Sequence, residues 1–150
     1  MNYWLFKSEP DEFGIDDLAV AKVQRWDGIR NYQARNLLRD EVAVGDQVLI
    51  YHSSCKEVGV AGIAEVVSAP YPDPLQFDPE SPYFDPKSSP DNPRWVSVDI
   101  TFVEKLPRVL RLQAIKAMPE LAEMVLIRQG RLSVQPVRKP EWQAIVASAR

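Results

Sequence analysis

Aromatic, basic and amide side chains are concentrated in the segment 26–36 of the sequence. These residues are Trp26, Arg30, Asn31, Tyr32, Gln33, Arg35 and Asn36. Arginines contact phosphates, aromatic rings stack on bases, and amides hydrogen-bond base edges. A helix that begins near Asn31 would add backbone N–H donors for an anion. The segment is typical of a nucleic-acid site, but Trp26 and Tyr32 would also suit a hydrophobic core, since tryptophan is usually largely buried.

His52 and Cys55 are the sole histidine and cysteine, three residues apart near a strand end. A Cys–His pair could act as a nucleophile and its base. On a strand this spacing places the two side chains on opposite faces, so direct contact would need a turn between them. We therefore interpret His52 as a hydrogen-bonding group beside a cleft or as a structural histidine.

The remaining polar groups give weaker signals. Lys7 and Ser8 form a polar pair at a strand end, which is also an ordinary way for a strand to leave a sheet. The adjacent carboxylates Asp16-Asp17 and Asp40-Glu41 would diverge by about 100° on a helix, which does not favour a catalytic or metal-binding pair. One histidine and one cysteine are too few soft ligands for an ordinary zinc site. We predict no metal, no cofactor and no enzymatic activity.

The elements that would position these groups can be read from hydrophobic periodicity and turn residues. Strands are expected at Asn2–Lys7, Gln47–His52, Glu57–Val67, Trp95–Phe102 and Arg131–Val137. Helices are expected at Ile15–Val23, from Asn31 to about Leu38, from Leu112, from Pro119 and from Pro140, with Trp26 on the turn that precedes the second. Short strands with short helices between and after them favour a compact mixed barrel with helices outside.

The segment 70–93 has a different texture, because it holds 8 of the 13 prolines together with four aromatic residues. Proline removes backbone donors and fixes φ, which disfavours regular strand or helix. A disordered linker would rarely carry so many rings. We expect an ordered excursion that packs its rings on the domain, and such loops are disproportionately functional.

Length and charge bound the class of protein. The 150 residues fit a single domain, residues 1–150, with one hydrophobic core. The net charge of −3 combines −9 up to Glu104 with +6 over residues 105–150, and the segment from Lys22 to Arg39 is itself basic. A mildly acidic total thus does not exclude an anionic partner. A single cysteine and the absence of a signal-like or membrane-spanning run predict a soluble, cytoplasmic protein with no membrane partner.

A series of motifs along the whole chain resembles the EVE domain family. The motifs are Tyr3–Pro10, Trp26–Asn36, Gly45-Asp46 followed by Tyr51-His52-Ser53, Gly59–Gly62, Pro72-Asp73-Pro74 with Gln76-Phe77-Asp78, Tyr83–Lys87, Pro93-Arg94-Trp95, and Arg131–Val137 with Trp142. The resemblance implies an α+β, PUA-like fold: a twisted β-barrel of about five or six strands with peripheral helices. It also implies kinship with YTH and ASCH domains.

The resemblance further implies a base pocket. Lys7 and Ser8 would lie at its edge and Trp26 would be a cage aromatic. Asn31 and Tyr32 would follow at the wall, and His52 and Ser53 would close the pocket from the neighbouring strand. Arg30, Arg35 and Arg94 are assigned to phosphate contacts on their chemistry.

The function implied is capture of a single modified base, such as methylated or hydroxymethylated cytosine, in DNA or RNA. The base would leave its stack, pack on Trp26 and place its polar edge on Ser8, Asn31 and Ser53. An effector would be a separate polypeptide. Two alternatives stay open: an enzyme acting on modified nucleotides through His52, and a protein-interaction module that uses the segment 70–93.

Overall fold

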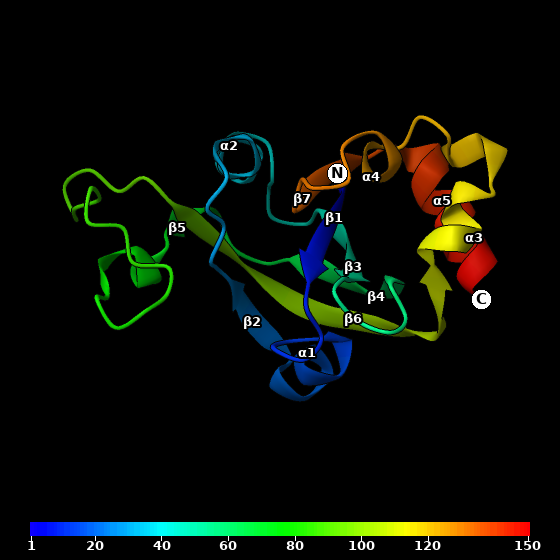
Figure 1. Ribbon diagram of the computed structural model, residues 1–150, viewed down its shortest axis with the longest axis horizontal. Coiled ribbons are helices and arrows are strands. Elements are labelled where there is room, and N and C mark those ends of the chain that lie inside the picture. Colours follow the sequence, from blue (N-terminus) through cyan, green and yellow to red (C-terminus); the bar gives the residue numbers. More distant parts are fainter.

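One twisted sheet of seven strands carries the fold of residues 1–150, all of which the computed structural model describes (Figure 1). The strands are β1 (Tyr3–Ser8), β2 (Val23–Trp26), β3 (Gln47–His52), β4 (Gly59–Val66), β5 (Tyr71–Pro72), β6 (Val96–Arg111) and β7 (Val134–Val137). They pair in the order β2-β6-β4-β3-β1-β7, and the short β5 pairs with β6 outside this path. The sheet is mixed, because β1 runs parallel to β3 while the other pairs are antiparallel.

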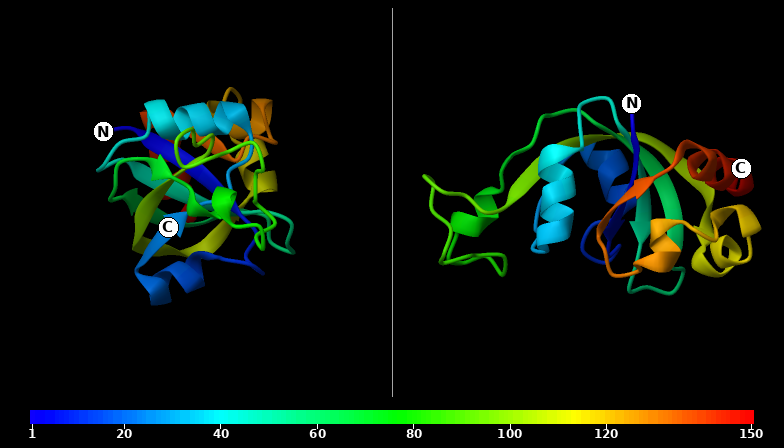
Figure 2. Two further views of the ribbon diagram at one scale, coloured as in Figure 1. Left: turned by 90° about the vertical axis from the view of Figure 1, so that its left-hand side faces the viewer. Right: turned by 90° about the horizontal axis from the view of Figure 1, so that it is seen from above.

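Helices cover this sheet without joining it. They are α1 (Ile15–Ala21), α2 (Tyr32–Asp40), α3 (Leu112–Lys116), α4 (Val125–Arg128) and α5 (Lys139–Ala149), with 3-10 turns at η1 (Pro74–Phe77) and η2 (Pro119–Leu121). Figure 2 shows α3 and α5 at one end of the long axis and η1 with its loops at the other, with α2 between them. None of the helices has the length and apolar character needed to cross a membrane.

Two hydrophobic clusters lie on opposite faces of the sheet. Successive side chains of a strand alternate between faces, so Trp4 and Phe6 of β1 join one cluster and Leu5 joins the other. The first cluster includes Leu38 of α2, and the second includes Ile145 of α5. Strand β1 is thus buried on both faces, which fixes the position of its carboxyl end, where Lys7 and Ser8 lie.

The structure confirms the α+β class, the twisted sheet and the peripheral helices, but it adds strands. Seven strands form where about five or six were predicted, and the sheet does not close into the predicted barrel, because β2 and β7 end the path without pairing to each other. Strand β6 continues to Arg111, well beyond the predicted end at Phe102. Its pairing with β4 shifts register at two irregularities. The alternation of apolar and polar residues is therefore interrupted in the sequence, although the hydrogen-bonded pairing of the two strands continues.

Strand β2 corrects two local predictions. Val23 was predicted at the end of a helix and Trp26 on a turn, but both pair with β6, Trp26 opposite Val98. The reason is tertiary: a four-residue strand has no periodicity of its own to detect and exists because β6 offers it a partner. The prediction of a helix capped by Asn31 is confirmed, since its side chain accepts a hydrogen bond from the Ala34 amide at 3.0 Å.

The segment 70–93 is held by buried polar side chains. The Gln76 side chain donates to the carbonyls of Asp73 and Trp95, both at 2.8 Å, and its oxygen accepts the amides of Arg94 and Trp95, both at 3.0 Å. Asp73 is fully buried. The predicted packing of rings holds only in part, because Phe84 stays 40% exposed.

Candidate functional site

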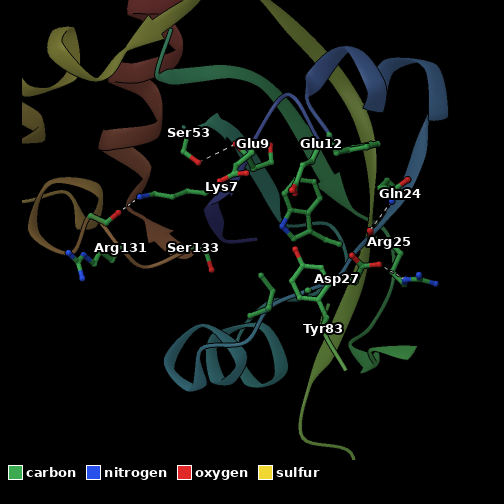
Figure 3. A pocket seen from close by; sticks show the side chains of 16 residues that line it. Lys7, Glu9, Glu12, Gln24, Arg25, Asp27, Ser53, Tyr83, Arg131 and Ser133 are labelled. Carbon is green, nitrogen blue, oxygen red and sulfur yellow. Dashed lines mark hydrogen bonds and ion pairs between the residues drawn. The ribbon is translucent and has the colours of Figure 1, made fainter. Parts of the chain in front are cut away.

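A cavity of about 560 Å³ opens beside the carboxyl end of β1. Its lining comes from β1 and the turn after it, from β2 and the turn after it, from the residue that follows β3, and from two loops. Among the lining residues are Lys7, Ser8, Glu9, Glu12, Phe13, Arg25, Trp26, Asp27, Gly28, Ser53, Tyr83, Arg131 and Ser133. Figure 3 shows Lys7 and Ser53 on one side of this lining and Arg25 and Asp27 on the other.

Trp26 belongs both to this lining and to the hydrophobic core. The sequence had left these open as alternatives, a ligand-facing ring or a core residue, and the structure combines them. Only 7% of its surface is exposed, and its ring packs on Phe6 at a centroid distance of 5.8 Å and edge-on to Phe13 at 6.3 Å. Trp4 and Trp95 donate their indole N–H groups to Asp46 and Asp85, whereas the hydrogen bonds within the chain leave the indole N–H of Trp26 unused. The pocket thus gains a rigid aromatic surface with a free donor.

Ser8, Ser53 and Lys7 gather at the pocket edge because β1 and β3 are parallel neighbours. The register places Ser8 opposite His52, and the next residue, Ser53, donates its amide to the Ser8 carbonyl at 2.8 Å. The Ser8 hydroxyl is buried and has no hydrogen-bond partner within the protein. An unpartnered buried polar group carries a desolvation cost, which a ligand could relieve.

Lys7 connects β1 to the loop before β7. Its ammonium donates to the Gly130 carbonyl and lies 5.3 Å from the centroid of the Tyr51 ring. Burial lowers the pKa of Lys7 from its usual value, because the charged form loses hydration. Lys7 therefore also holds a wall of the pocket in place.

Tyr83 is a wall residue that the sequence did not single out. Gly28 has a φ of 77°, and a Cβ added there would lie 3.0 Å from the Tyr83 ring, so the ring packs directly on the glycine. Arg30 fixes the same segment by donating to the Tyr83 carbonyl through Nε at 3.0 Å and Nη2 at 2.8 Å. The four rings of the segment 70–93 indicated packing, but no local pattern distinguishes the ring that reaches the pocket.

Arg30, for which a phosphate contact is predicted, is held by contacts within the chain. Its guanidinium pairs with the buried Asp73 at 2.9 Å and lies 5.5 Å and 5.4 Å from the ring centroids of Tyr83 and Trp95. The guanidinium makes four hydrogen bonds within the chain. One of them goes to Asp73, a buried carboxylate that needs a partner. Arg30 does not line the cavity.

Asn31 and His52 also lie outside the lining, and both cap helices. The Asn31 side chain is bound to the first turn of α2. His52 accepts the Ile15 amide on Nε2 at 3.1 Å, at the start of α1. Burial is the main cause that lowers the pKa of His52, and the charges of Asp16 and Asp17 oppose it. An accepting Nε2 requires the neutral imidazole.

Tyr32, Arg35 and Arg94 form a separate cluster beside the pocket. Tyr32 stacks on Trp95 at a centroid distance of 4.8 Å and is half exposed. Arg35 donates to the Arg94 carbonyl at 2.7 Å, and Arg94 donates to the Tyr32 hydroxyl at 3.3 Å. None of the three lines the cavity.

Arg131 and Ser133 are lining residues that were predicted only as part of a strand. The strand begins at Val134, so the preceding residues form a loop that reaches the pocket. The Arg131 side chain is exposed, whereas Arg25 at the opposite side is paired with Asp27 at 2.8 Å. The net positive charge of residues 105–150 indicated that basic side chains there could face an anionic ligand, but it did not indicate that Arg131 would reach this pocket.

A twisted α+β sheet with a polar and aromatic pocket at the ends of two parallel strands defines a PUA-like domain. The chain belongs to the EVE domain family, whose model matches residues 2–148. Human thymocyte nuclear protein 1 is 39% identical over 97% of this chain and 73% of its own length. The Danio rerio protein of the same name is 40% identical over 96% and 70%.

Solved structures show the same fold. A crystal structure of human THYN1 protein in complex with DNA that contains 5-methylcytosine has a TM-score of 0.95 at 37% identity, covering 100% of this chain and 98% of that chain. A Pseudomonas syringae protein has a TM-score of 0.95 at 48% identity, covering 99% of both chains. An ASCH protein from Zymomonas mobilis, at 14% identity and a TM-score of 0.58, shares the fold.

Proposed function

We propose that this chain binds DNA that carries a modified cytosine and holds that base in the pocket beside Trp26. The observation that supports this most is that two residues lining one cavity of about 560 Å³ each carry an unused polar group, the buried Ser8 hydroxyl and the Trp26 indole N–H. The complex of human THYN1 protein with 5-methylcytosine DNA supports the choice of ligand.

Base capture follows from the side chains that line the pocket. A base that leaves the duplex costs a few kcal/mol of lost stacking and pairing, and aromatic contacts in the pocket repay part of that cost. Trp26 and Tyr83 supply these contacts. The hydroxyls of Ser8 and Ser53 can bond the polar edge of the base, and a carboxylate such as Glu12 can accept the exocyclic amine of cytosine.

Recognition of the modification rests on pocket volume. A methyl group that fills an apolar gap contributes about 1–3 kcal/mol, so we expect modest discrimination between methylated and plain cytosine. The exposed Arg131 at the rim is placed to contact a phosphate. Affinity should therefore fall as salt rises.

We propose a binding role and not an enzymatic one. His52 is engaged in capping α1 and does not line the cavity. It is thus not placed to act as the general base that the enzymatic alternative required, since a base must lie within hydrogen-bond reach of the proton it takes. The segment 70–93 serves this pocket through Tyr83 and Asp73, which supports a nucleic-acid role for it over a protein-interaction role.

The test is titration of the protein with 5-methyl-2′-deoxycytidine and with deoxycytidine, followed by tryptophan fluorescence. We expect quenching by the methylated nucleoside, loss of affinity in Ser8→Ala, and loss of most quenching in Trp26→Phe, which keeps a ring in the core. Trp142→Phe is the matched control, because Trp142 packs on Tyr3 and neither residue lines the cavity. No quenching at millimolar nucleoside, or equal affinity in all variants, would contradict the proposal.

A further inference from the structure

Outside the pocket, Tyr32 presents an aromatic ring that is 50% exposed. One face stacks on Trp95, with centroids 4.8 Å apart and planes 29° apart. The Arg35 guanidinium carbon lies 4.8 Å from the Tyr32 centroid and 5.9 Å from the Trp95 centroid. If Arg35 and Trp95 lay on opposite faces of Tyr32, they would be separated by nearly the sum of their two distances to it. They therefore lie on the same side, and the other face of Tyr32 is open.

The ring of Tyr32 is supported from behind. Trp95 is 6% exposed, and its indole N–H donates to Asp85 at 2.8 Å. The Arg30 guanidinium contacts both the Trp95 and the Tyr83 rings, so a chain of contacts leads from Tyr32 at the surface to Tyr83 at the pocket. A ring fixed in this way loses little conformational freedom when a ligand packs on it.

Two cations lie beside the Tyr32 ring, Arg35 on its Trp95 side and Arg94 at its hydroxyl. Arg94 donates to the Tyr32 hydroxyl at 3.3 Å, and Arg35 donates to the Arg94 carbonyl. Neither arginine takes part in an ion pair within the chain. Two carboxylates lie near these arginines, Asp40 near Arg35 and Asp85 near Arg94. The pKa of Asp85 is lowered mainly by the hydrogen bond from Trp95 and in smaller part by the charge of Arg94. A positive rim around an aromatic face suits a nucleotide, which has a π face and a phosphate.

We propose that the open face of Tyr32 stacks on the base next to the captured one, with Arg35 and Arg94 at the intervening phosphates. This inference rests on the proposed function for the identity of the strand. We call the open face of Tyr32 with Arg35 and Arg94 the platform. Its ligand differs from that of the pocket: it is the flanking nucleotide of single-stranded or locally opened DNA. A free nucleoside in the pocket would not reach it.

The experiment compares two probes on the same variants. One is 5-methyl-2′-deoxycytidine alone, and the other is a single-stranded oligonucleotide of about nine residues with 5-methylcytosine at its centre. For Tyr32→Leu, which keeps apolar volume against Trp95, we expect nucleoside affinity unchanged and oligonucleotide affinity lowered about tenfold, the size of one lost base–aromatic stack. Tyr32→Phe should bind both probes like the unaltered protein, because it keeps the ring.

Salt dependence supplies a second measurement. Arg94→Gln should reduce the slope of log affinity against log salt by about 0.7 for the oligonucleotide, the value for one phosphate contact on a single strand. It should leave nucleoside binding unchanged. The fold uses the main chain of Arg94, whose amide donates to Gln76 and whose carbonyl accepts from Arg35, and its side chain forms no ion pair. Thermal melting should therefore show that the variant folds.

Each outcome decides between the two proposals. Equal oligonucleotide affinity in Tyr32→Leu and Tyr32→Phe overturns the platform, as does an equal loss for both probes in Tyr32→Leu, which would place Tyr32 in the function of the pocket. If the oligonucleotide binds and responds to Tyr32→Leu but not to Trp26→Phe, the pocket fails and the platform stands. If the unaltered protein binds neither probe, both proposals fail.

Discussion

At the scale of single residues, the site is made by side chains that serve the fold and the pocket together. Trp26 is a core ring with one free donor, and Lys7 ties β1 to a loop while it lines the cavity. Arg30 is the opposite case, because its charge is consumed by Asp73 and by the Tyr83 carbonyl. A buried carboxylate needs such a partner, so the type of residue 30 reflects Asp73 more than any ligand.

Gly28 offers a test of how tightly Tyr83 is held. Gly28→Ala adds a Cβ 3.0 Å from the Tyr83 ring at a φ of 77°, so we expect about 1–2 kcal/mol of lost stability and a weaker pocket. The matched control is Gly45→Ala, where φ is 93° and a Cβ would meet nothing within 4 Å. Denaturant unfolding and nucleoside titration measure both effects. Lower affinity in Gly28→Ala alone is expected, and an equal loss in both variants would contradict the role of Tyr83.

His52 predicts a pH dependence of stability. Burial lowers its pKa in the folded protein below the usual 6.5, so the unfolded chain binds more protons as pH falls below 6.5. The contribution of His52 to stability is therefore present above 6.5 and is lost as pH falls through the folded pKa. We expect the free energy of unfolding to fall more steeply between pH 7 and pH 5 in the unaltered protein than in His52→Gln, which retains an acceptor but does not titrate. Parallel slopes would show that His52 is not buried neutral.

At the scale of elements, α2 separates two neighbouring surfaces. Its N-terminal turn holds Asn31 as the cap and Tyr32 as the exposed ring, and the strand before it holds Trp26 in the pocket. The run 26–36 therefore does not form one site, because a turn and a helix start point its side chains in different directions. Sequence spacing alone could not reveal this, since it depends on β2 pairing with β6.

The cap of α2 can be tested apart from the pocket. Asn31→Ala removes the acceptor for the Ala34 amide, and we expect a loss of about 1 kcal/mol in the free energy of unfolding. Asn31→Asp should restore it, because a carboxylate also caps a helix start. Nucleoside affinity should be the same in all three proteins. If Asn31→Ala instead weakened nucleoside binding without loss of stability, Asn31 would belong to the pocket, as the sequence resemblance implied.

At the scale of the whole molecule, most strands and helices were predictable because their hydrophobic patterns are local. Gln47–His52 was predicted with the bounds that β3 has. The elements that were missed or shortened depend on partners: β2 on β6, and the far half of β6 on the bulged edge of β4. For the site, the motifs of the resemblance indicated Lys7, Ser8, Trp26 and Ser53, which do line the cavity. Tyr83 and Arg131 required the fold, because they enter from loops 50 or more residues away along the chain from Trp26.

The sheet order also bears on synthesis of the chain. Strand β1 lies between β3 and β7, and Phe6 pairs with Val134. At a translation rate of about 5–20 residues per second, the first strand waits on the order of ten seconds for its second neighbour to be made. During that time one edge of β1, with the aromatic and aliphatic residues Trp4, Leu5 and Phe6, is unpaired. The nascent chain thus exposes an unpaired, apolar strand edge that is prone to aggregation until β7 is made. This exposure follows from the order of strands in the sheet and not from the ligand.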